Sequence, residues 1–297
     1  MLRDPRLQSD TVTDGTRECE ATIAGTRTRW WEYGDGGDTV IAVHGFRGDH
    51  HGLQRVIDRL PEYRILSPDL PGYGGSTTLA EPHSIPAYAD WLIDFVTATA
   101  GGRRPFTILA HSFGTIVTAA AIDRGLSPDR VVLINPIATS PLAGIQAIGT
   151  TLVRGLYRLG AVLPHRLGDR LLRARLITDG MSVLTTTTRD RELRRWIKAE
   201  HRRYFAGFRS RRVVVEGFEA SLSDHVTPHV AAFTMPTLLI AAGRDQITPI
   251  ADVRGLRERM PDAQLVELEG VGHLIHYERP AEAAEAIRAF LAAQVRT

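Results

Sequence analysis

The sequence lacks paired cysteines, long apolar runs and a signal-peptide pattern, the features typical of secreted and membrane proteins. It has a single cysteine, Cys19, which rules out an internal disulfide and leads us to expect the reducing cytoplasm. No stretch reaches the roughly 18 consecutive apolar residues that a membrane span needs. The N-terminal MLRDPRLQSD also lacks the apolar centre of a signal peptide. We therefore expect neither a membrane span nor secretion.

An overall charge bias is also missing. The formal net charge is +2 at pH 7, so the whole molecule shows no preference for nucleic acid or for an anionic membrane. Locally, however, residues 154–212 hold fifteen arginines and Lys198 against Asp169, Asp179, Asp190, Glu192 and Glu200. We interpret this basic segment as a solvated helical face, and the alternative is a docking surface for an anionic substrate, membrane or partner.

Apolar residues, at 43% of the 297-residue chain, are numerous enough for a large core. Alternating runs at 19–24 and 26–33 predict an opening hairpin. Short β-branched runs then follow, separated by longer amphipathic segments, at 39–43, 63–68, 106–110, 130–134, 237–241 and 263–268. Such a pattern predicts a mostly parallel sheet flanked by helices, which we expect near 50–60, 86–100, 113–125, 250–260 and 280–294.

About a hundred residues between Ile134 and Thr237 interrupt this rhythm and look helical, which is too long for a crossover in a compact sheet. We predict an inserted helical cap at 137–230 and a core domain made of 1–136 and 231–297. The apolar stretch from Leu142 to Leu163 is then more consistent with packing over a pocket than with a membrane anchor.

The run at 106–110 leads into His111-Ser112-Phe113-Gly114 and then into a helix-compatible segment. A strand, a tight turn with small residues two before and two after a serine, and a helix make up the context of a nucleophile elbow. Ala110 and Gly114 occupy those two positions. An isolated HSFG would be better explained by Ser112 as a helix N-cap, so further motifs must decide.

Three further motifs follow predicted strands. The glycine-rich HGFRG at 44–48 can aim the Phe46 N–H at a reacting oxygen, with the Phe113 N–H as second donor. Asp245, within GRDQITP at 243–249, can orient a histidine and stabilise its charged form. His273, within GHLIHYERP at 272–280, can reach the serine hydroxyl as a base.

Together with DLPGYGGS at 69–76, these motifs make the chain resemble the α/β-hydrolase superfamily from about Thr39 to the C-terminus, apart from the cap. The resemblance implies an α/β fold with an eight-stranded, mostly parallel sheet flanked by helices. It also implies a cap inserted after the sixth strand and a triad in the order Ser112, Asp245, His273. The superfamily's G-H-x-x-x-x-E-x-P spacing selects His273 over His276 as base, and Asp252 is interpreted as a surface charge.

Residues beside these motifs are candidates for substrate contact: His44, Gly45, Arg47, His111 and His276. For His44 and His111 the stronger interpretation is structural, with the first fixing the turn and the second pointing away from the serine. His276 is a packed or pocket-lining histidine. Arg47 could meet an anionic group of a substrate, although surface arginines are the commoner case.

The expected function is hydrolysis of a small-molecule carboxylic ester, lactone or thioester through an acyl-enzyme on Ser112. No metal or cofactor and no nucleic-acid partner is expected, and oligomeric state is not predicted. Two alternatives use the same triad, a carbon–carbon bond hydrolase and the menaquinone-pathway lyase. The HGFRG turn of this chain resembles the corresponding turn of that lyase. The arginine that often follows that lyase's elbow is missing at Thr115 and Ile116. A ligand-binding homologue with a silent triad is the alternative of another class.

Overall fold

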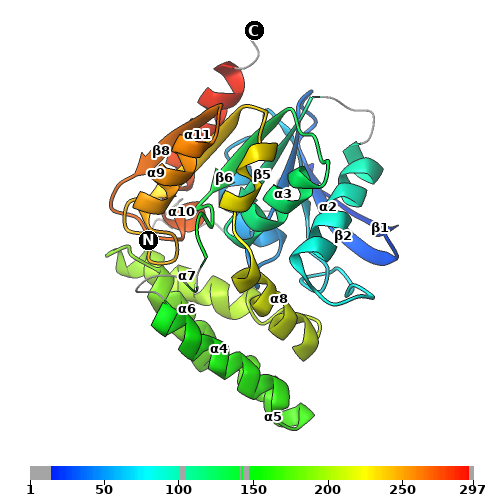
Figure 1. Ribbon diagram of the computed structural model, residues 1–297, viewed down its shortest axis with the longest axis vertical. Coiled ribbons are helices and arrows are strands. Elements are labelled where there is room, and N and C mark those ends of the chain that lie inside the picture. The colour runs from blue at the N-terminus through cyan, green and yellow to red at the C-terminus, as the bar shows by residue number, and fades with distance from the viewer. Residues whose placement is uncertain (1–14, 101–104, 141, 143–146, 294–297) are drawn as a thin grey trace.

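The computed structural model describes residues 15–100, 105–140, 142 and 147–293 (Figure 1). Its centre is one eight-stranded sheet with the strand order β1-β2-β4-β3-β5-β6-β7-β8. The strands are β1 (Arg17–Ile23), β2 (Thr26–Tyr33), β3 (Thr39–Val43), β4 (Arg64–Pro68), β5 (Phe106–His111), β6 (Arg130–Ile134), β7 (Thr237–Ala242) and β8 (Ala263–Leu268). All the predicted strands are present, and their observed ends differ by at most two residues from the predictions.

The sheet is mostly parallel. Strand β1 pairs antiparallel with β2, and β2 pairs antiparallel with β4, whereas every pair from β4 to β8 is parallel. Successive side chains of β3 enter opposite layers: Ile41 and Val43 pack into one core cluster, and Val40 and Ala42 into the other. Burial of both faces explains why β3 to β7 are nearly continuous apolar runs rather than alternating ones.

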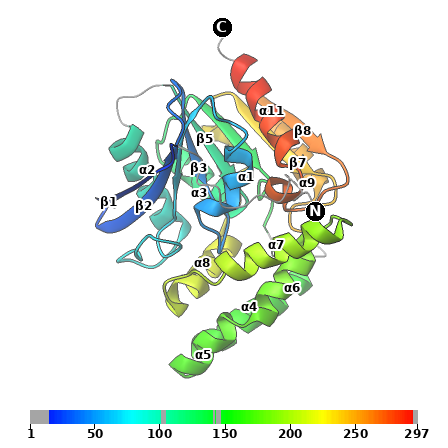
Figure 2. The ribbon, with the colours of Figure 1, turned by 180° about the vertical axis from the view of Figure 1, so that it is seen from behind.

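Helices cover both faces of the sheet (Figures 1 and 2). On one face, α1 (Gln54–Ile57), α10 (Ile275–Glu278) and α11 (Pro280–Ala293) contribute to one core cluster. On the other, α2 (Ile85–Ala100), α3 (Phe113–Asp123) and α9 (Ile250–Arg259) contribute to the second cluster. The helix predicted at 50–60 is instead a 3₁₀ turn, η2 (His50–Leu53), followed by the short α1. The Asp49 side chain caps the 3₁₀ turn by accepting from His51 N.

The segment between β6 and β7 is helical, as the sequence predicts. It contains α4 (Ala147–Val162), α5 (His165–Leu172), α6 (Arg175–Thr185), α7 (Arg191–Tyr204), α8 (Arg211–Ser223) and the 3₁₀ turn η3 (Thr227–Ala232). In both views α4 and α5 lie farthest from the sheet (Figures 1 and 2). The 3₁₀ turn η3 packs against α3. Helices α4–α8 fall within 137–230, and the domain boundaries themselves stay a prediction. Within the described segments, no helix is both long and apolar enough to span a bilayer.

Candidate active site

Ser112 lies between β5 and α3 in a conformation that few non-glycine residues adopt, with φ 52° and ψ −118°. Hydrogen bonds on both sides hold this strained backbone. The Ser112 N–H donates to Ile134 O at 3.1 Å, and the Thr115 N–H and hydroxyl donate to Ser112 O at 2.8 and 2.6 Å. A Cβ at Gly114 would lie 2.6 Å from Val43 O, so only glycine lets α3 start this close to β3.

The structure brings the three predicted triad residues together from loops that follow β5, β7 and β8. The Ser112 hydroxyl donates to His273 Nε2 at 2.7 Å, and His273 Nδ1–H donates to Asp245 Oδ2 at 2.8 Å. The His273 side chain is 6% exposed and that of Asp245 is fully buried. The carboxylate therefore fixes the tautomer in which the Nε2 lone pair faces the serine.

Asp245 accepts several hydrogen bonds besides that from His273. The Ile247 and Thr248 N–H groups donate to Oδ1 at 2.8 and 3.1 Å, and the Thr248 hydroxyl donates to Oδ2 at 2.6 Å. Burial alone would raise the pKa of this carboxyl. The neighbouring His273 and the hydrogen bonds outweigh burial and lower the pKa to about 2. Asp245 thus stays ionised at any pH at which the protein is expected to work.

Asn135 is a site residue that the sequence reasoning missed. Its Nδ2 donates to Asp245 Oδ2 at 2.8 Å, and the residue is fully buried, directly after β6. Its φ of 47° lies in the left-handed region, which asparagine enters more easily than most residues. An asparagine at the carboxyl end of a strand next to the elbow strand was the available signal.

His44 fixes the turn that follows β3. Its Nδ1–H donates to Gly45 O at 2.8 Å, and its Nε2 accepts from the Leu70 N–H at 2.9 Å. Burial lowers the pKa of His44, so the ring stays neutral with one nitrogen as donor and the other as acceptor. These contacts agree with the structural interpretation of His44.

The held turn places Gly45 against the nucleophile. A Cβ on Gly45 would lie 3.0 Å from His111 Nδ1 and 3.4 Å from Ser112 Cβ, so the glycine permits this close approach. Phe46 follows at once, and Phe113 is the first residue of α3, where no intrahelical acceptor exists for its N–H. Neither N–H donates to an acceptor in the described chain, which leaves both available to an oxyanion.

Arg47 does not take the position expected of a substrate ligand. Its guanidinium is buried among cap residues and donates to Phe205 O at 3.0 Å, the Tyr157 hydroxyl at 3.0 Å and Leu172 O at 3.2 Å. The side chain does not contribute to the wall of the cavity at Ser112. The sequence interpretation was wrong because the cap approaches this turn and offers carbonyl oxygens that the arginine satisfies.

A cavity of about 650 Å³ opens at Ser112 between the sheet and the cap. Its size suits a small-molecule substrate. The described residues that form its wall include no aspartate, glutamate, lysine or arginine. Apolar and aromatic side chains of the core and the cap supply most of the wall: Phe46, Leu53, Phe113, Ile116, Ile137, Val153, Met181, Leu184, Phe205, Phe218, Leu222, Ile247, Leu274 and Tyr277.

His111 and His276 contribute to this wall beside the triad, with ring centroids 4.1 Å apart. His111 Nε2–H donates to His273 O at 3.3 Å. Burial, with repulsion from His273, lowers the pKa of His111 to about 3. Burial also lowers the pKa of His276 well below its usual range, and His111 adds to the shift. The rings are therefore neutral polar groups, and their contact with substrate stays a prediction.

Comparison with known proteins agrees with this geometry. A family model described as the Alpha/beta hydrolase family matches residues 40–286, which include every triad residue. The chain belongs to the alpha/beta hydrolase family. Membership agrees with the mostly parallel eight-stranded sheet described above. It also shows that the protein is an enzyme of the hydrolase type.

Relatives of this hydrolase carry different names. It is 24% identical to the dihydrolipoyllysine-residue acetyltransferase component of an acetoin cleaving system of Pseudomonas putida, over 96% of this chain and 74% of that protein. It is 25% identical to an N-formylmaleamate deformylase of Pseudomonas putida, over 86% and 88% of the two chains. An esterase from Exiguobacterium antarcticum superposes with a TM-score of 0.77 at 16% identity, over 93% and 100% of the chains. That likeness shows the fold alone.

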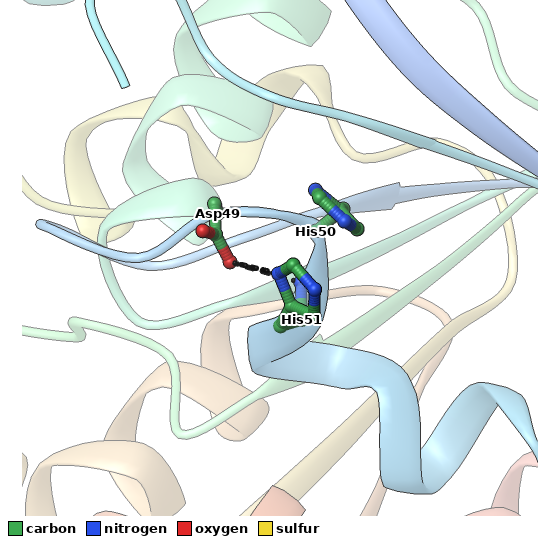
Figure 3. Close-up of side chains that lie close together, drawn as sticks. All are labelled: Asp49, His50 and His51. Carbon is green, nitrogen blue, oxygen red and sulfur yellow. Dashed lines mark hydrogen bonds and ion pairs between the residues drawn. The ribbon is translucent and has the colours of Figure 1, made fainter. Parts of the chain in front are cut away.

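The hydrolase also contains a cluster that the sequence did not predict, Asp49, His50 and His51 (Figure 3). One possible ligand atom from each residue lies within 4.8 Å of the others. However, His51 Nδ1 already bonds Asp49 Oδ1 at 3.0 Å, and His50 Nδ1 bonds Asp69 Oδ1 at 2.9 Å.

The two imidazole rings of this cluster are packed as well as bonded. The His50 ring stacks on Trp31 of β2, and the His51 ring stacks on Tyr204 of α7. We interpret the cluster as a contact that joins the sheet to the cap, and we assign no metal to it.

Proposed function

We propose that this hydrolase cleaves an uncharged, largely apolar carboxylic ester, lactone or thioester through an acyl-enzyme on Ser112. The observation that carries the proposal is the continuous pair of hydrogen bonds from Ser112 through His273 to Asp245, at 2.7 and 2.8 Å. Both distances are in the range that a serine, base and orienting carboxylate need for proton transfer.

In the first half-reaction, His273 Nε2 takes the Ser112 proton while Oγ forms a bond to the carbonyl carbon of the substrate. The negative oxygen of the tetrahedral intermediate is stabilised by the N–H groups of Phe46 and Phe113. When the bond to the leaving group breaks, His273 returns the proton to the departing alcohol or thiol. Asp245 stays ionised throughout and stabilises the imidazolium, in agreement with its pKa of about 2.

In the second half-reaction, water replaces the alcohol. His273 takes a proton from this water as its oxygen attacks the acyl carbon, and the same two N–H groups stabilise the second oxyanion. Collapse of the intermediate breaks the bond between Oγ and the acyl carbon. The proton then returns to Ser112, and the carboxylic acid leaves.

The cavity supports the substrate class. Its described wall holds no aspartate, glutamate, lysine or arginine, and its histidines 111 and 276 are neutral. A charged substrate would lose its hydration there without gaining an ionic partner, whereas an apolar acyl chain or alcohol would bury its surface favourably. The relative named a deformylase supports hydrolysis as the reaction type.

The test is turnover of a panel of p-nitrophenyl esters of increasing acyl length, with lactones, thioesters and amides run in parallel. Ser112→Ala should lower kcat by roughly 10⁴-fold or more while the midpoint of thermal unfolding stays close to that of wild type. Ser67→Ala is the matched control, because Ser67 is a buried serine of β4 that does not contribute to the cavity wall. Undiminished ester turnover in Ser112→Ala would contradict the proposal.

A further inference from the structure

Large apolar side chains that are exposed to solvent gather on one part of the described chain, the outer cap. Monomeric proteins rarely concentrate exposed apolar residues in this way without a binding role. Each residue of the set has between 48% and 83% of its surface exposed. We call the set the apolar cap face, and it consists of Leu152, Leu159 and Val162 on α4, Leu167 on α5, and Leu176 and Val183 on α6.

The members of the apolar cap face follow helical spacing. Leu152 and Leu159 are seven residues apart on α4, as are Leu176 and Val183 on α6, so each pair lies on one side of its helix. Figures 1 and 2 show α4 and α5 at the end of the molecule farthest from the sheet. No other described element covers these side chains.

Arginines are interleaved with these apolar residues. Arg166, Arg170 and Arg175 flank Leu167 and Leu176 and are exposed. None of the three forms an ion pair with an acidic side chain anywhere in the described ranges. Long arginine side chains can keep their charged ends in water while their stems extend over apolar surface. A surface with exposed aliphatic residues and unpaired arginines is complementary to a layer with an apolar interior and anionic headgroups.

We propose that the apolar cap face docks on the surface of an anionic lipid bilayer, with its aliphatic side chains among the acyl chains and its arginines at the headgroup phosphates. A second copy of the chain fits this face less well. A symmetric dimer would bring the unpaired arginines of both copies into one interface, where the like charges would repel. An anionic lipid surface has no such conflict.

The apolar cap face continues into the cavity above Ser112. Leu184 is 47% exposed on α6 and also forms part of the cavity wall, as do Met181 on the same helix and Val153 on α4. A docked bilayer would therefore lie at the rim of the cavity, and an apolar molecule could pass between the two without crossing water. Docking goes beyond the proposed function and can be measured whether or not the protein hydrolyses esters.

The experiment is co-sedimentation of the full chain with vesicles of phosphatidylcholine alone, and with vesicles containing an equal part of phosphatidylglycerol. One variant, Leu152→Ser/Val162→Ser/Leu176→Ser, removes apolar surface. A second, Arg166→Gln/Arg170→Gln, removes charge. The matched control is Arg257→Gln/Arg259→Gln, which removes the same charge from exposed positions on α9 of the core. Thermal unfolding of each variant establishes that it is folded.

We expect binding to the anionic vesicles that weakens roughly tenfold in each cap variant, weakens at about 0.5 M salt and is unchanged in the control. Equal binding of the wild type and of both folded cap variants would overturn the proposal, as would the absence of binding to anionic vesicles. Light scattering behind a sizing column tests the rival occupant. A dimer that the apolar variant dissociates, without vesicle binding, would assign the face to a second copy.

Discussion

The burial of His201 on α7 predicts that the stability of this hydrolase depends measurably on pH. The residue is fully buried, its ring stacks on Phe205, and neither ring nitrogen has a hydrogen-bond partner in the described chain. Burial lowers the pKa of His201 to about 3. In the unfolded chain the same imidazole has a pKa of about 6.5.

The sign and size of the effect follow from proton linkage. Below about pH 6.5 the unfolded chain binds a proton at this position that the folded protein does not bind until about pH 3, so stability falls as pH falls through that range. Between pH 7 and pH 5 these two pKa values correspond to a loss of about 2 kcal/mol from His201 alone.

The perturbation is His201→Phe, which keeps a ring on Phe205 and removes both unpaired nitrogens. We expect the variant to be about 1 kcal/mol more stable than wild type at pH 7, because an unsatisfied buried polar group is lost. Its loss of stability between pH 7 and pH 5 should also be about 2 kcal/mol smaller than that of wild type.

Urea unfolding at the two pH values, followed by circular dichroism, measures both effects. His201→Leu serves as the control for packing, because it cannot titrate either and should show the same reduced pH dependence whatever its stability at pH 7. If both variants keep the full pH dependence of wild type, the buried ring is not its source and the reasoning is refuted.

Three further substitutions test the site and its supports. Asn135→Gly, which tolerates positive φ, should lower kcat/KM for a p-nitrophenyl ester about tenfold because Asp245 loses a donor, and unchanged kinetics would count against that role. Gly114→Ala should lower the free energy of unfolding, measured with urea, by about 3 kcal/mol, because the added Cβ would collide with the backbone of β3. The control Gly155→Ala on α4 has open space around the added Cβ and should leave the stability unchanged or raise it. Arg47→Met should lower the free energy of unfolding by about 3 kcal/mol, because the carbonyl oxygens of Phe205 and Leu172 lose their donor. Amide hydrogen exchange in α5 and α7 should become faster, and unchanged exchange there would contradict the role of Arg47 in holding the cap.

Much of the fold could be predicted from the sequence because its signals are local. Strands β3 to β7 are short apolar runs between turn-forming residues, and each is buried on two faces, so composition alone marks them. The triad could be predicted for a related reason. Ser112, Asp245 and His273 each follow such a strand, and parallel strands bring their carboxyl ends to one edge of the sheet.

The features that were missed depend on contacts between distant segments. Asn135 has a role only because Asp245, 110 residues later, folds back onto it. Arg47 is held by Phe205, 158 residues away, once the cap has packed. The burial of His201 likewise depends on how the cap meets the core. Only Asn135 had a local signal, its position directly after β6. No local pattern distinguishes Arg47 or His201 from ordinary surface residues.

The proposed chemistry requires above all that Ser112 is a live nucleophile. Incubation of the folded protein with a fluorophosphonate probe, followed by digestion and mass spectrometry, tests that claim directly. We predict a single adduct, on the peptide that contains Ser112, which is lost in Ser112→Ala and forms far more slowly in His273→Ala. A folded wild-type protein that gains no adduct, or gains it on another residue, would contradict the assignment.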